Sequence, residues 1–213
     1  MPDFDLKIVN GTVANTSETF RADIATRGGL IVAIGNDLGD AVRTIDAQGR
    51  YVLPGGIEAH CHIEQESSSG LMTADDYYSG SVSAAFGGNT CIIPFAAQHR
   101  GQSLDAVLET YHGRAGPKSV VDYSFHLIIS DPTDDVLNVE LPRAIESGVT
   151  SFKIYMTYDR LLVDDGQMLD ILAVAKKHGA LTMIHAENNA MIKWMGGRLV
   201  DSGHRAPKYH ALS

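Results

Sequence analysis

Two histidines separated by one residue, His60 and His62, follow an apolar stretch of the chain. Residues i and i+2 of a β-strand point to the same face, so both imidazoles project together if this stretch is a strand. Two convergent neutral imidazoles chelate a transition metal. The pair alone is a weak indication, because two histidines in a surface loop would have the same spacing. His185, after another apolar stretch, is either a further imidazole ligand or a hydrogen-bonded core or capping residue.

Lys153 lies inside the apolar segment 151–156. Lysine is almost never fully buried without a partner, and burial of an unpaired ammonium lowers its pKa. A lysine near the end of a strand can instead extend its ammonium to solvent. A buried, neutral amine can react with CO2 to give an anionic carbamate, whose two oxygens can bridge two cations. Lys153 is therefore the most informative residue of the candidate metal site.

Alternating strand and helix patterns position these residues. Strands are predicted at 51–63, 90–95, 121–129, 150–156 and 181–186, and helices at 74–86, 103–115, 136–147, 167–177 and 190–199. Five strand–helix units indicate an α/β fold with parallel strands and right-handed crossovers. His60, His62 and His185 then lie at the C-terminal ends of the first and fifth strands, where such folds place their sites.

The first part of the chain has a different pattern. Residues 1–52 read as short strands separated by turns, with Asn10-Gly11 as a predicted hairpin turn, which indicates a small β unit of meander type. We therefore expect two parts, 1–52 and 53–213. Periodicity does not distinguish a doubly wound open sheet from a barrel in the second part. A complete eight-fold barrel needs roughly 250 residues, so this part has room for about five units.

Composition excludes several classes of function. The formal net charge of −9 and the absence of a basic block argue against nucleic acid or an anionic membrane as partner. The N-terminus lacks the pattern of a signal peptide, and no apolar run reaches the length of a membrane span. Cys61 and Cys91 are too few for a disulfide scaffold and fit a reducing compartment. We expect a soluble, cytoplasmic protein.

Three segments resemble the motifs of dihydropyrimidinases and D-hydantoinases, the cyclic amidases of the amidohydrolase superfamily. Residues 54–62, Pro-Gly-Gly-Ile-Glu-Ala-His-Cys-His, resemble their strand-1 motif. Residues 151–158, Ser-Phe-Lys-Ile-Tyr-Met-Thr-Tyr, resemble the strand-4 motif that carries a carboxylated lysine. Residues 185–188, His-Ala-Glu-Asn, resemble the strand-5 motif. The order and spacing agree across the whole chain, including the β-rich N-terminal segment.

The resemblance implies a metal-dependent-hydrolase barrel of TIM type, present here as about its first five βα units, with 1–52 as part of a small β-sandwich. It implies two divalent metal ions, normally Zn²⁺. His60 and His62 would bind one metal, His185 the other, and carboxylated Lys153 would bridge them. Tyr158 would donate a hydrogen bond to the substrate carbonyl and its developing oxyanion. A metal-bridged hydroxide would open the cyclic amide of dihydropyrimidines or 5-substituted hydantoins, giving N-carbamoyl amino acids.

The chain departs from the family pattern in two ways. The family also uses a histidine on strand 6 and an aspartate on strand 8, and this chain ends before either. We therefore expect an N-terminal portion that is inactive alone, because an incomplete barrel exposes an unpaired strand edge. The loop at 64–70 is more polar than in many hydantoinases, where it lines the pocket for the exocyclic group of the substrate. This predicts a more polar substituent. A homo-oligomer, usually a tetramer, is also implied.

Two kinds of alternative stay open. Allantoinase and dihydroorotase share the metal architecture and act on other small cyclic substrates. A non-catalytic scaffold, like the collapsin response mediator proteins, is disfavoured because all four ligands that the chain is long enough to contain are present. We expect structural roles for the remaining histidines, with His126 hydrogen-bonded in the third strand. Loop or helix-surface positions are expected for His99, His112, His178, His204 and His210.

Overall fold

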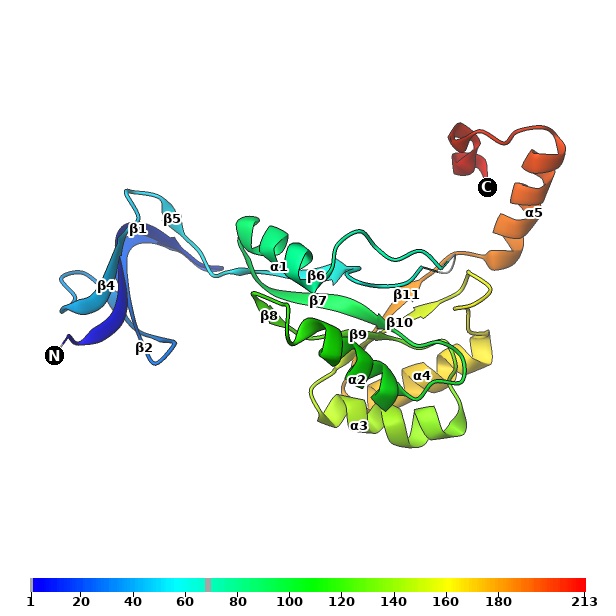
Figure 1. Ribbon diagram of the computed structural model, residues 1–213, viewed down its shortest axis with the longest axis horizontal. Coiled ribbons are helices and arrows are strands. Elements are labelled where there is room, and N and C mark those ends of the chain that lie inside the picture. Colours follow the sequence, from blue (N-terminus) through cyan, green and yellow to red (C-terminus); the bar gives the residue numbers. More distant parts are fainter. Residues whose placement is uncertain (1, 68–69) are drawn as a thin grey trace. The chain divides into compact units, whose positions relative to one another are not determined.

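The structure is a computed structural model that describes residues 2–67 and 70–213 (Figure 1). The chain divides into two compact units, one ending at Gly55 and one formed by Gly56–Ser213. The sequence places this division after residue 52. Each unit is built on a sheet of its own, and each is described here by itself.

The first unit is a five-stranded sheet in the order β3-β2-β1-β4, with β5 also paired to β1. Its strands are β1 (Phe4–Ala14), β2 (Thr19–Arg27), β3 (Leu30–Gly35), β4 (Ala41–Asp46) and β5 (Tyr51–Val52). The first three are antiparallel neighbours, whereas β4 and β5 run parallel to β1. The predicted meander is therefore right for three strands and wrong for the last two.

The hairpin predicted at Asn10-Gly11 is also wrong, because β1 continues through both residues. Asn10 has a left-handed backbone with φ of 57°, and the pairing of β1 with β2 shifts register at this point. The Asn10 N–H donates to Asp23 Oδ1 at 3.1 Å. A Cβ on Gly11 would lie 2.6 Å from Val52 Cγ2, so any larger residue here would force the Val52 side chain to move. The Asn-Gly pair thus forms a β-bulge instead of a turn.

The second unit is built on a parallel sheet with its strands side by side in sequence order. These are β6 (Gly56–Cys61), β7 (Asn89–Ala97), β9 (His126–Ile128), β10 (Ser151–Tyr155) and β11 (Leu181–His185), with β8 (Asp122–Tyr123) also on β7. The third predicted strand is thus split into two short pieces along β7. Between them, the Ser124 N–H still donates to the Ile92 carbonyl at 3.1 Å, so the chain stays attached to its neighbour.

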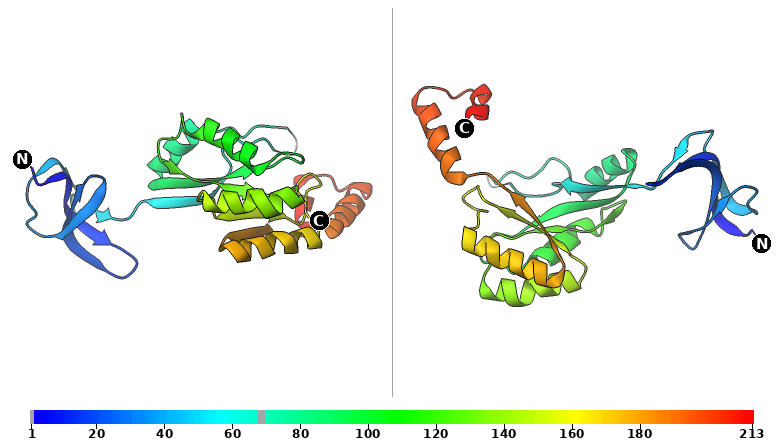
Figure 2. Two further views of the ribbon diagram at one scale, coloured as in Figure 1. Left: turned by 90° about the horizontal axis from the view of Figure 1, so that it is seen from below. Right: turned by 180° about the vertical axis from the view of Figure 1, so that it is seen from behind.

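All five predicted helices are present. They are α1 (Tyr77–Phe86), α2 (Leu104–Ala115), α3 (Leu141–Glu146) after the π-helix η1 (Val136–Glu140), α4 (Asp165–His178) and α5 (Asn189–Asp201). Helices α1 to α4 contact one another in succession and cover the sheet as one layer (Figures 1 and 2). Helix α5 packs instead with the 3₁₀ segment η2 (Pro207–Leu212). No helix in the described ranges is long and apolar enough to cross a membrane.

Helix boundaries follow from capping residues. Ser103, the expected N-cap of α2, accepts a hydrogen bond from the Ala106 N–H at 3.2 Å. Asp164 and Gln167 form a capping box at the start of α4. Gly179 ends α4 with a left-handed φ of 73°, as its position after the apolar pattern predicts.

Strand order and the single helical layer settle the choice that periodicity left open. A doubly wound sheet reverses its strand order and carries helices on both faces, whereas this sheet does neither. The strands form a curled half-barrel of the α/β class. Ile92, Phe152 and Ile154 belong to the core between sheet and helices. The alternate positions Phe95 and Tyr155 form a smaller cluster, and Lys153 shares their face of the sheet, which we call the inner face.

Candidate metal centre

His60 and His62 lie together at the end of β6. His60 is within the strand and His62 follows its last residue. The ring centroids are 6.0 Å apart. Each ring packs against Phe95 of β7, at centroid distances of 4.9 Å for His60 and 4.7 Å for His62. The i, i+2 spacing therefore brings both imidazoles to one side of the sheet, with both residues exposed to solvent.

Lys153 is buried in the middle of β10, with only 8% of its surface exposed. Its Nζ lies 5.9 Å from the ring centroid of Phe95 and 5.5 Å from that of Tyr155. Within the described residues, Nζ has no hydrogen bond and no ion pair. Burial lowers the pKa of this lysine, as expected for an ammonium without a counter-ion. The side chain does not extend to solvent, so the alternative of a snorkelling lysine is wrong.

His185 is the last residue of β11 and pairs in register with Tyr155. The two rings stack with centroids 5.4 Å apart. His185 Nε2 contacts Glu187 Oε2, a carboxylate–imidazole pair of the kind that orients metal-ligating histidines. Its Nδ1 has no hydrogen-bond partner in the described part of the chain.

Tyr158 follows β10 in a strained conformation. Its backbone φ is 67°, in the left-handed region that non-glycine residues rarely adopt. Its carbonyl accepts hydrogen bonds from the N–H groups of Leu161 and Leu162, each at 2.8 Å. This turn places the centroid of the phenol ring 5.2 Å from that of the His185 ring and 5.8 Å from that of the Tyr155 ring. The predicted oxyanion donor therefore lies beside the predicted ligand of the second metal.

The predicted ligands occupy one face of the half-barrel in a row. His60 and His62 surround Phe95, Lys153 lies between Phe95 and Tyr155, and His185 lies beyond Tyr155. No three His, Cys, Asp or Glu side chains of the described residues come together closely enough to hold a metal ion. The central position belongs to Lys153, which is buried and has no counter-ion. A carbamate on Lys153 would supply the missing anion there, so the donor set fits a pair of cations.

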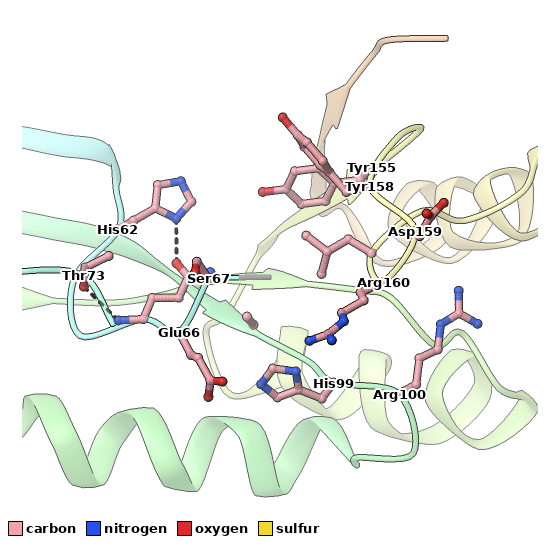
Figure 3. A pocket seen from close by; sticks show the side chains of 13 residues that line it. His62, Glu66, Ser67, Thr73, His99, Arg100, Tyr155, Tyr158, Asp159 and Arg160 are labelled. Atoms are coloured by element: carbon pink, nitrogen blue, oxygen red, sulfur yellow. Dashed lines mark hydrogen bonds between the residues drawn. The ribbon is translucent and has the colours of Figure 1, made fainter. Parts of the chain in front are cut away.

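A cavity of about 550 Å³ opens beside these residues (Figure 3). His62, Tyr155 and Tyr158 line one part of it, and the loop after β6 contributes Gln65 and Glu66. Ser67 also lines the cavity, so the polar loop predicted at 64–70 does border it. Ser68 and Ser69 of that loop lie outside the described residues.

Two arginines reach the cavity from other loops. The Arg100 guanidinium is hydrogen-bonded, since its Nη2 donates to the Leu162 carbonyl at 3.1 Å. Asp159 contacts Lys193 in an ion pair. The guanidinium of Arg160 has no hydrogen-bond or ion-pair partner within the described residues, and Figure 3 shows it extending toward the side where His99 lies. The cavity thus has a free cationic group away from His62.

Two polar partners of the ligands were not predicted from the sequence. Gln65 Oε1 lies 2.6 Å from His62 Nδ1, and Glu187 contacts His185. Glu187 could have been found from its i+2 spacing to His185, whereas the Gln65 contact depends on a loop conformation without periodicity. His126 has the structural role expected of it. Its Nε2 lies 3.0 Å from the Ala59 carbonyl, its Nδ1 contacts the Ser151 hydroxyl, and burial lowers its pKa.

Comparison with known proteins identifies the family of the chain. Residues 51–211 match the sequence profile of the Amidohydrolase family, so the chain belongs to that family. It is 44% identical to a D-hydantoinase of Geobacillus stearothermophilus, over 97% of this chain and 44% of that protein. It is 38% identical to an Escherichia coli D-phenylhydantoinase, over 97% of this chain and 45% of that protein.

Solved structures give the same result for the fold. A D-hydantoinase structure superposes with a TM-score of 0.94 at 43% identity, over 98% of this chain and 46% of that one. The dihydropyrimidinase from Brevibacillus agri NCHU1002 gives a TM-score of 0.92 at 40% identity, over 97% of this chain and 45% of that one. The chain therefore spans less than half the length of these relatives.

Proposed function

We propose that this chain carries the metal-binding part of a cyclic amide hydrolase that opens dihydropyrimidines or 5-substituted hydantoins to N-carbamoyl amino acids. The observation that carries the proposal is that Lys153 is buried without a counter-ion. It lies between the imidazoles of His60 and His62 on the β6 side and that of His185 on β11. The similarity to D-hydantoinases and a dihydropyrimidinase supports the substrate class. The catalytic part would begin near residue 53, with residues 1–52 as a separate β domain.

The chain's own residues would divide the work in the following way. His60 and His62 would hold one divalent cation, His185 a second, and carboxylated Lys153 would lie between them. When bound, the cations, which we infer to be Zn²⁺, supply Lewis-acid activation of the amide carbonyl and of the attacking water. Tyr158 would donate its phenolic proton to the substrate carbonyl oxygen, where negative charge develops. Glu187 would fix the ring orientation of His185.

A substrate panel tests the reaction. Protein expressed from its complete coding sequence would be assayed on dihydrouracil, hydantoin, allantoin and dihydroorotate. We expect dihydrouracil and hydantoins to be opened, with release of N-carbamoyl products. Turnover of allantoin or dihydroorotate alone would replace the proposed substrate by that of a related cyclic amidase.

Metal analysis separates the enzyme from a non-catalytic scaffold. We expect the purified protein to retain about two zinc ions per chain, and chelation to abolish turnover until zinc and bicarbonate are restored, the latter as the source of the carbamate. A protein that purifies without metal and does not take it up would contradict the metal site.

The ring substituent of the substrate is proposed to be polar. The support is the lining of the cavity by Gln65, Glu66 and the free guanidinium of Arg160. We expect a hydantoin with a carboxylate-bearing 5-substituent to be preferred over one with an isobutyl group. In Arg160→Ala the ratio of kcat/KM for the two substrates should fall about tenfold, as for loss of one charge-assisted hydrogen bond. An unchanged ratio would remove Arg160 from substrate recognition.

We further infer that the 213 residues alone are inactive, and that the working protein is a cytoplasmic homo-oligomer. Ile57 on β6 is 63% exposed and Leu181 on β11 is 64% exposed, at the two outer strands of the half-barrel. Such open edges favour association or aggregation. Free Cys61 and Cys91 suit a reducing compartment. Light scattering of the protein expressed from the complete coding sequence tests the oligomeric state. An activity assay of the 213-residue chain tests its inactivity.

A further inference from the structure

Glu64, two residues after His62, has a backbone conformation that needs external support. Its φ is 46°, in the left-handed region, which a non-glycine side chain adopts only when surrounding contacts compensate. Its N–H donates to the Asp75 carbonyl at 2.9 Å. Its carbonyl accepts a hydrogen bond from Arg114 Nη1 at 2.8 Å. Both backbone polar groups of Glu64 are therefore hydrogen-bonded.

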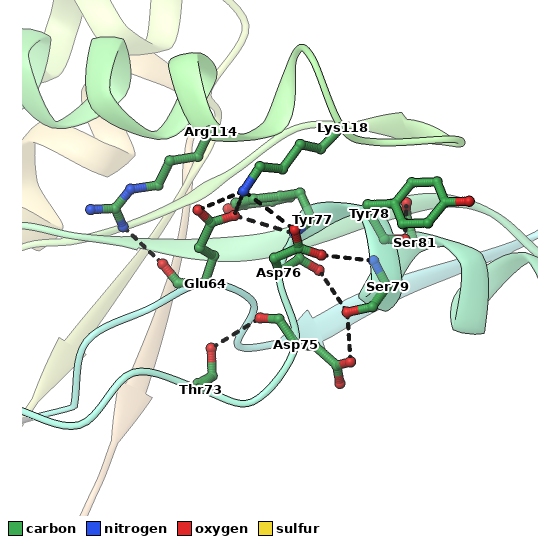
Figure 4. A network of polar contacts seen from close by, with 10 residues as sticks. All are labelled: Glu64, Thr73, Asp75, Asp76, Tyr77, Tyr78, Ser79, Ser81, Arg114 and Lys118. Atoms are coloured by element: carbon green, nitrogen blue, oxygen red, sulfur yellow. Dashed lines mark hydrogen bonds and ion pairs between the residues drawn. The ribbon is translucent and has the colours of Figure 1, made fainter.

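Lys118, just beyond α2, fixes the side chain of the same residue (Figure 4). Its Nζ lies 2.9 Å from both Oε1 and Oε2 of Glu64 and 3.3 Å from Oδ2 of Asp76, the N-cap of α1. Glu64 Oε2 also accepts the Tyr77 N–H at 3.3 Å. The hydrogen bond to Glu64 is the main cause that raises the pKa of Lys118, so the ammonium remains charged. We call Lys118, Arg114, Glu64 and Asp76 the loop clamp.

The residue immediately after Glu64 reaches the candidate metal centre. Gln65 donates its N–H to Thr73 Oγ1 at 3.1 Å, and its carbonyl accepts the Thr73 N–H at 3.0 Å. With its backbone hydrogen-bonded to Thr73 through both N–H and carbonyl, Gln65 places Oε1 at 2.6 Å from His62 Nδ1. An amide oxygen only accepts hydrogen bonds, so this contact favours the tautomer with the proton on Nδ1. The Nε2 lone pair of a neutral His62 is then free to bind a metal.

A network of this kind would ordinarily serve only to hold a loop in place. Here it converges on a loop that carries both a predicted ligand and part of the cavity wall. The contacts run without interruption from α2 through Glu64 to Gln65 and His62. A path of hydrogen bonds therefore links the His62 imidazole to Arg114 on α2 and to Lys118 just beyond this helix.

We propose that Lys118 and Arg114 are positioning residues, which clamp Glu64, hold Gln65 against Nδ1 of His62 and so present Nε2 as the metal-binding nitrogen. The inference rests on the proposed function, because it concerns a histidine of the proposed metal site. Neither residue touches the metal, and their effect is transmitted through Gln65.

The first test reads the tautomer of His62 in metal-free protein, which requires no catalysis. Nitrogen-15 NMR would be recorded above the titration range of imidazole, with His62 assigned from the spectrum of His62→Asn. We expect the Nδ1–H tautomer in the wild type and in Lys177→Met, a matched lysine in the last turn of α4. Gln65→Leu and Lys118→Met should populate the Nε2–H tautomer. An unchanged His62 tautomer in both variants would overturn the proposal.

The second test measures zinc affinity by competition with a chelator. Loss of a hydrogen bond to a metal-ligating histidine lowers metal affinity about 10–100-fold, the range expected for Gln65→Leu. Lys118→Met should weaken binding by a smaller factor, and Lys118→Arg, which keeps the charge and the reach, should restore it. Gln65→Leu leaves the loop clamp intact, so it is informative even if Lys118→Met folds poorly.

The two tests also separate this inference from the proposed function. If the wild type binds no zinc, the proposed metal site is wrong, while the tautomer still reports on the loop clamp. If the wild type binds zinc and both Gln65→Leu and Lys118→Met bind it equally well, the positioning role is wrong and the metal site stands.

Discussion

The two sides of the inner face hold their functional groups by different means. On the β10–β11 side, Lys153 is buried and Tyr155 pairs in register with His185, so strand geometry sets the positions. On the β6 side, both histidines are exposed and His62 lies in a loop that hydrogen bonds hold in place. Groups on strands are fixed by the packing of the fold, whereas groups on loops need dedicated polar contacts. Substitutions on the two sides should therefore have different effects on stability, activity and metal binding.

The largest expected effect comes from Lys153→Met on the buried side. Loss of the proposed bridging group should reduce kcat/KM on the order of 1,000-fold or more, as for loss of several kcal/mol of metal-assisted stabilisation. The metal-free protein should nevertheless gain on the order of 1–3 kcal/mol of unfolding free energy, because a buried ammonium without a partner is replaced by an apolar side chain. Urea denaturation measures this change, and Lys176→Met on the exposed face of α4 serves as control. A loss of stability in Lys153→Met would contradict the absence of a counter-ion.

Tyr158→Phe should have the next largest effect and should change activity alone. Removing one oxyanion donor lowers kcat about 100–1,000-fold. Zinc content should stay unchanged, because the phenol is not among the proposed ligands. Tyr78→Phe on α1, at a position 59% exposed, is the matched control. An effect on KM alone would show that Tyr158 binds the substrate without stabilising the transition state.

Acid should weaken the loop clamp on the β6 side through Asp76. The Ser79 N–H, and after it Lys118, holds the pKa of Asp76 below its usual range. Its contribution to stability is therefore fully present above the ordinary carboxyl pKa and is lost as pH falls through the lowered value. Asp76→Asn keeps an N-cap acceptor without the charge. Its thermal midpoint should lie below that of the wild type near neutral pH and meet it in acid. A constant difference at all pH values would exclude the charge of Asp76 as the cause.

The smallest effect is expected from an ion pair that resembles the loop clamp but borders no functional residue. Arg143 contacts Asp105 between α2 and α3, with both side chains about half exposed. Such surface pairs contribute little to stability. Arg143→Ala should change neither the unfolding midpoint nor zinc affinity measurably. A change in zinc affinity comparable to that of Lys118→Met would mean that any loss of charge on the helical layer disturbs the site.

The sequence predicted the second unit better than the first. The five strand–helix units and the shared edge of His60, His62 and His185 follow from hydrophobic periodicity and from the rule for parallel strands. The Asn10-Gly11 hairpin was wrong because the same dipeptide also suits a β-bulge, and only the approach of Val52 distinguishes the two. Local sequence carries no information on that distant contact.

Within the candidate site, the positions of the proposed ligands could be predicted from the sequence, whereas their hydrogen-bond partners could not. Lys153 stands out because lysine is unusual within an apolar strand. The contacts of Gln65 depend on the left-handed backbone of Glu64, and the place of Tyr158 depends on its own left-handed φ. Neither residue type favours that conformation, so tertiary contacts impose it and periodicity cannot reveal it.

Phe95 and Tyr155 give the inner face a way to hold the Lys153 ammonium in the absence of a metal ion. The negative faces of aromatic rings attract cations, and the Lys153 ammonium lies within 6 Å of both ring centroids. The two rings thus partly replace the missing counter-ion, so that the buried ammonium is tolerated in the metal-free protein. In the function proposed above, Lys153 would have to lose a proton before its amine could take up CO2. If the proposed function is right, folding of this unit would not require zinc, and zinc supply would set the fraction of folded molecules that are active.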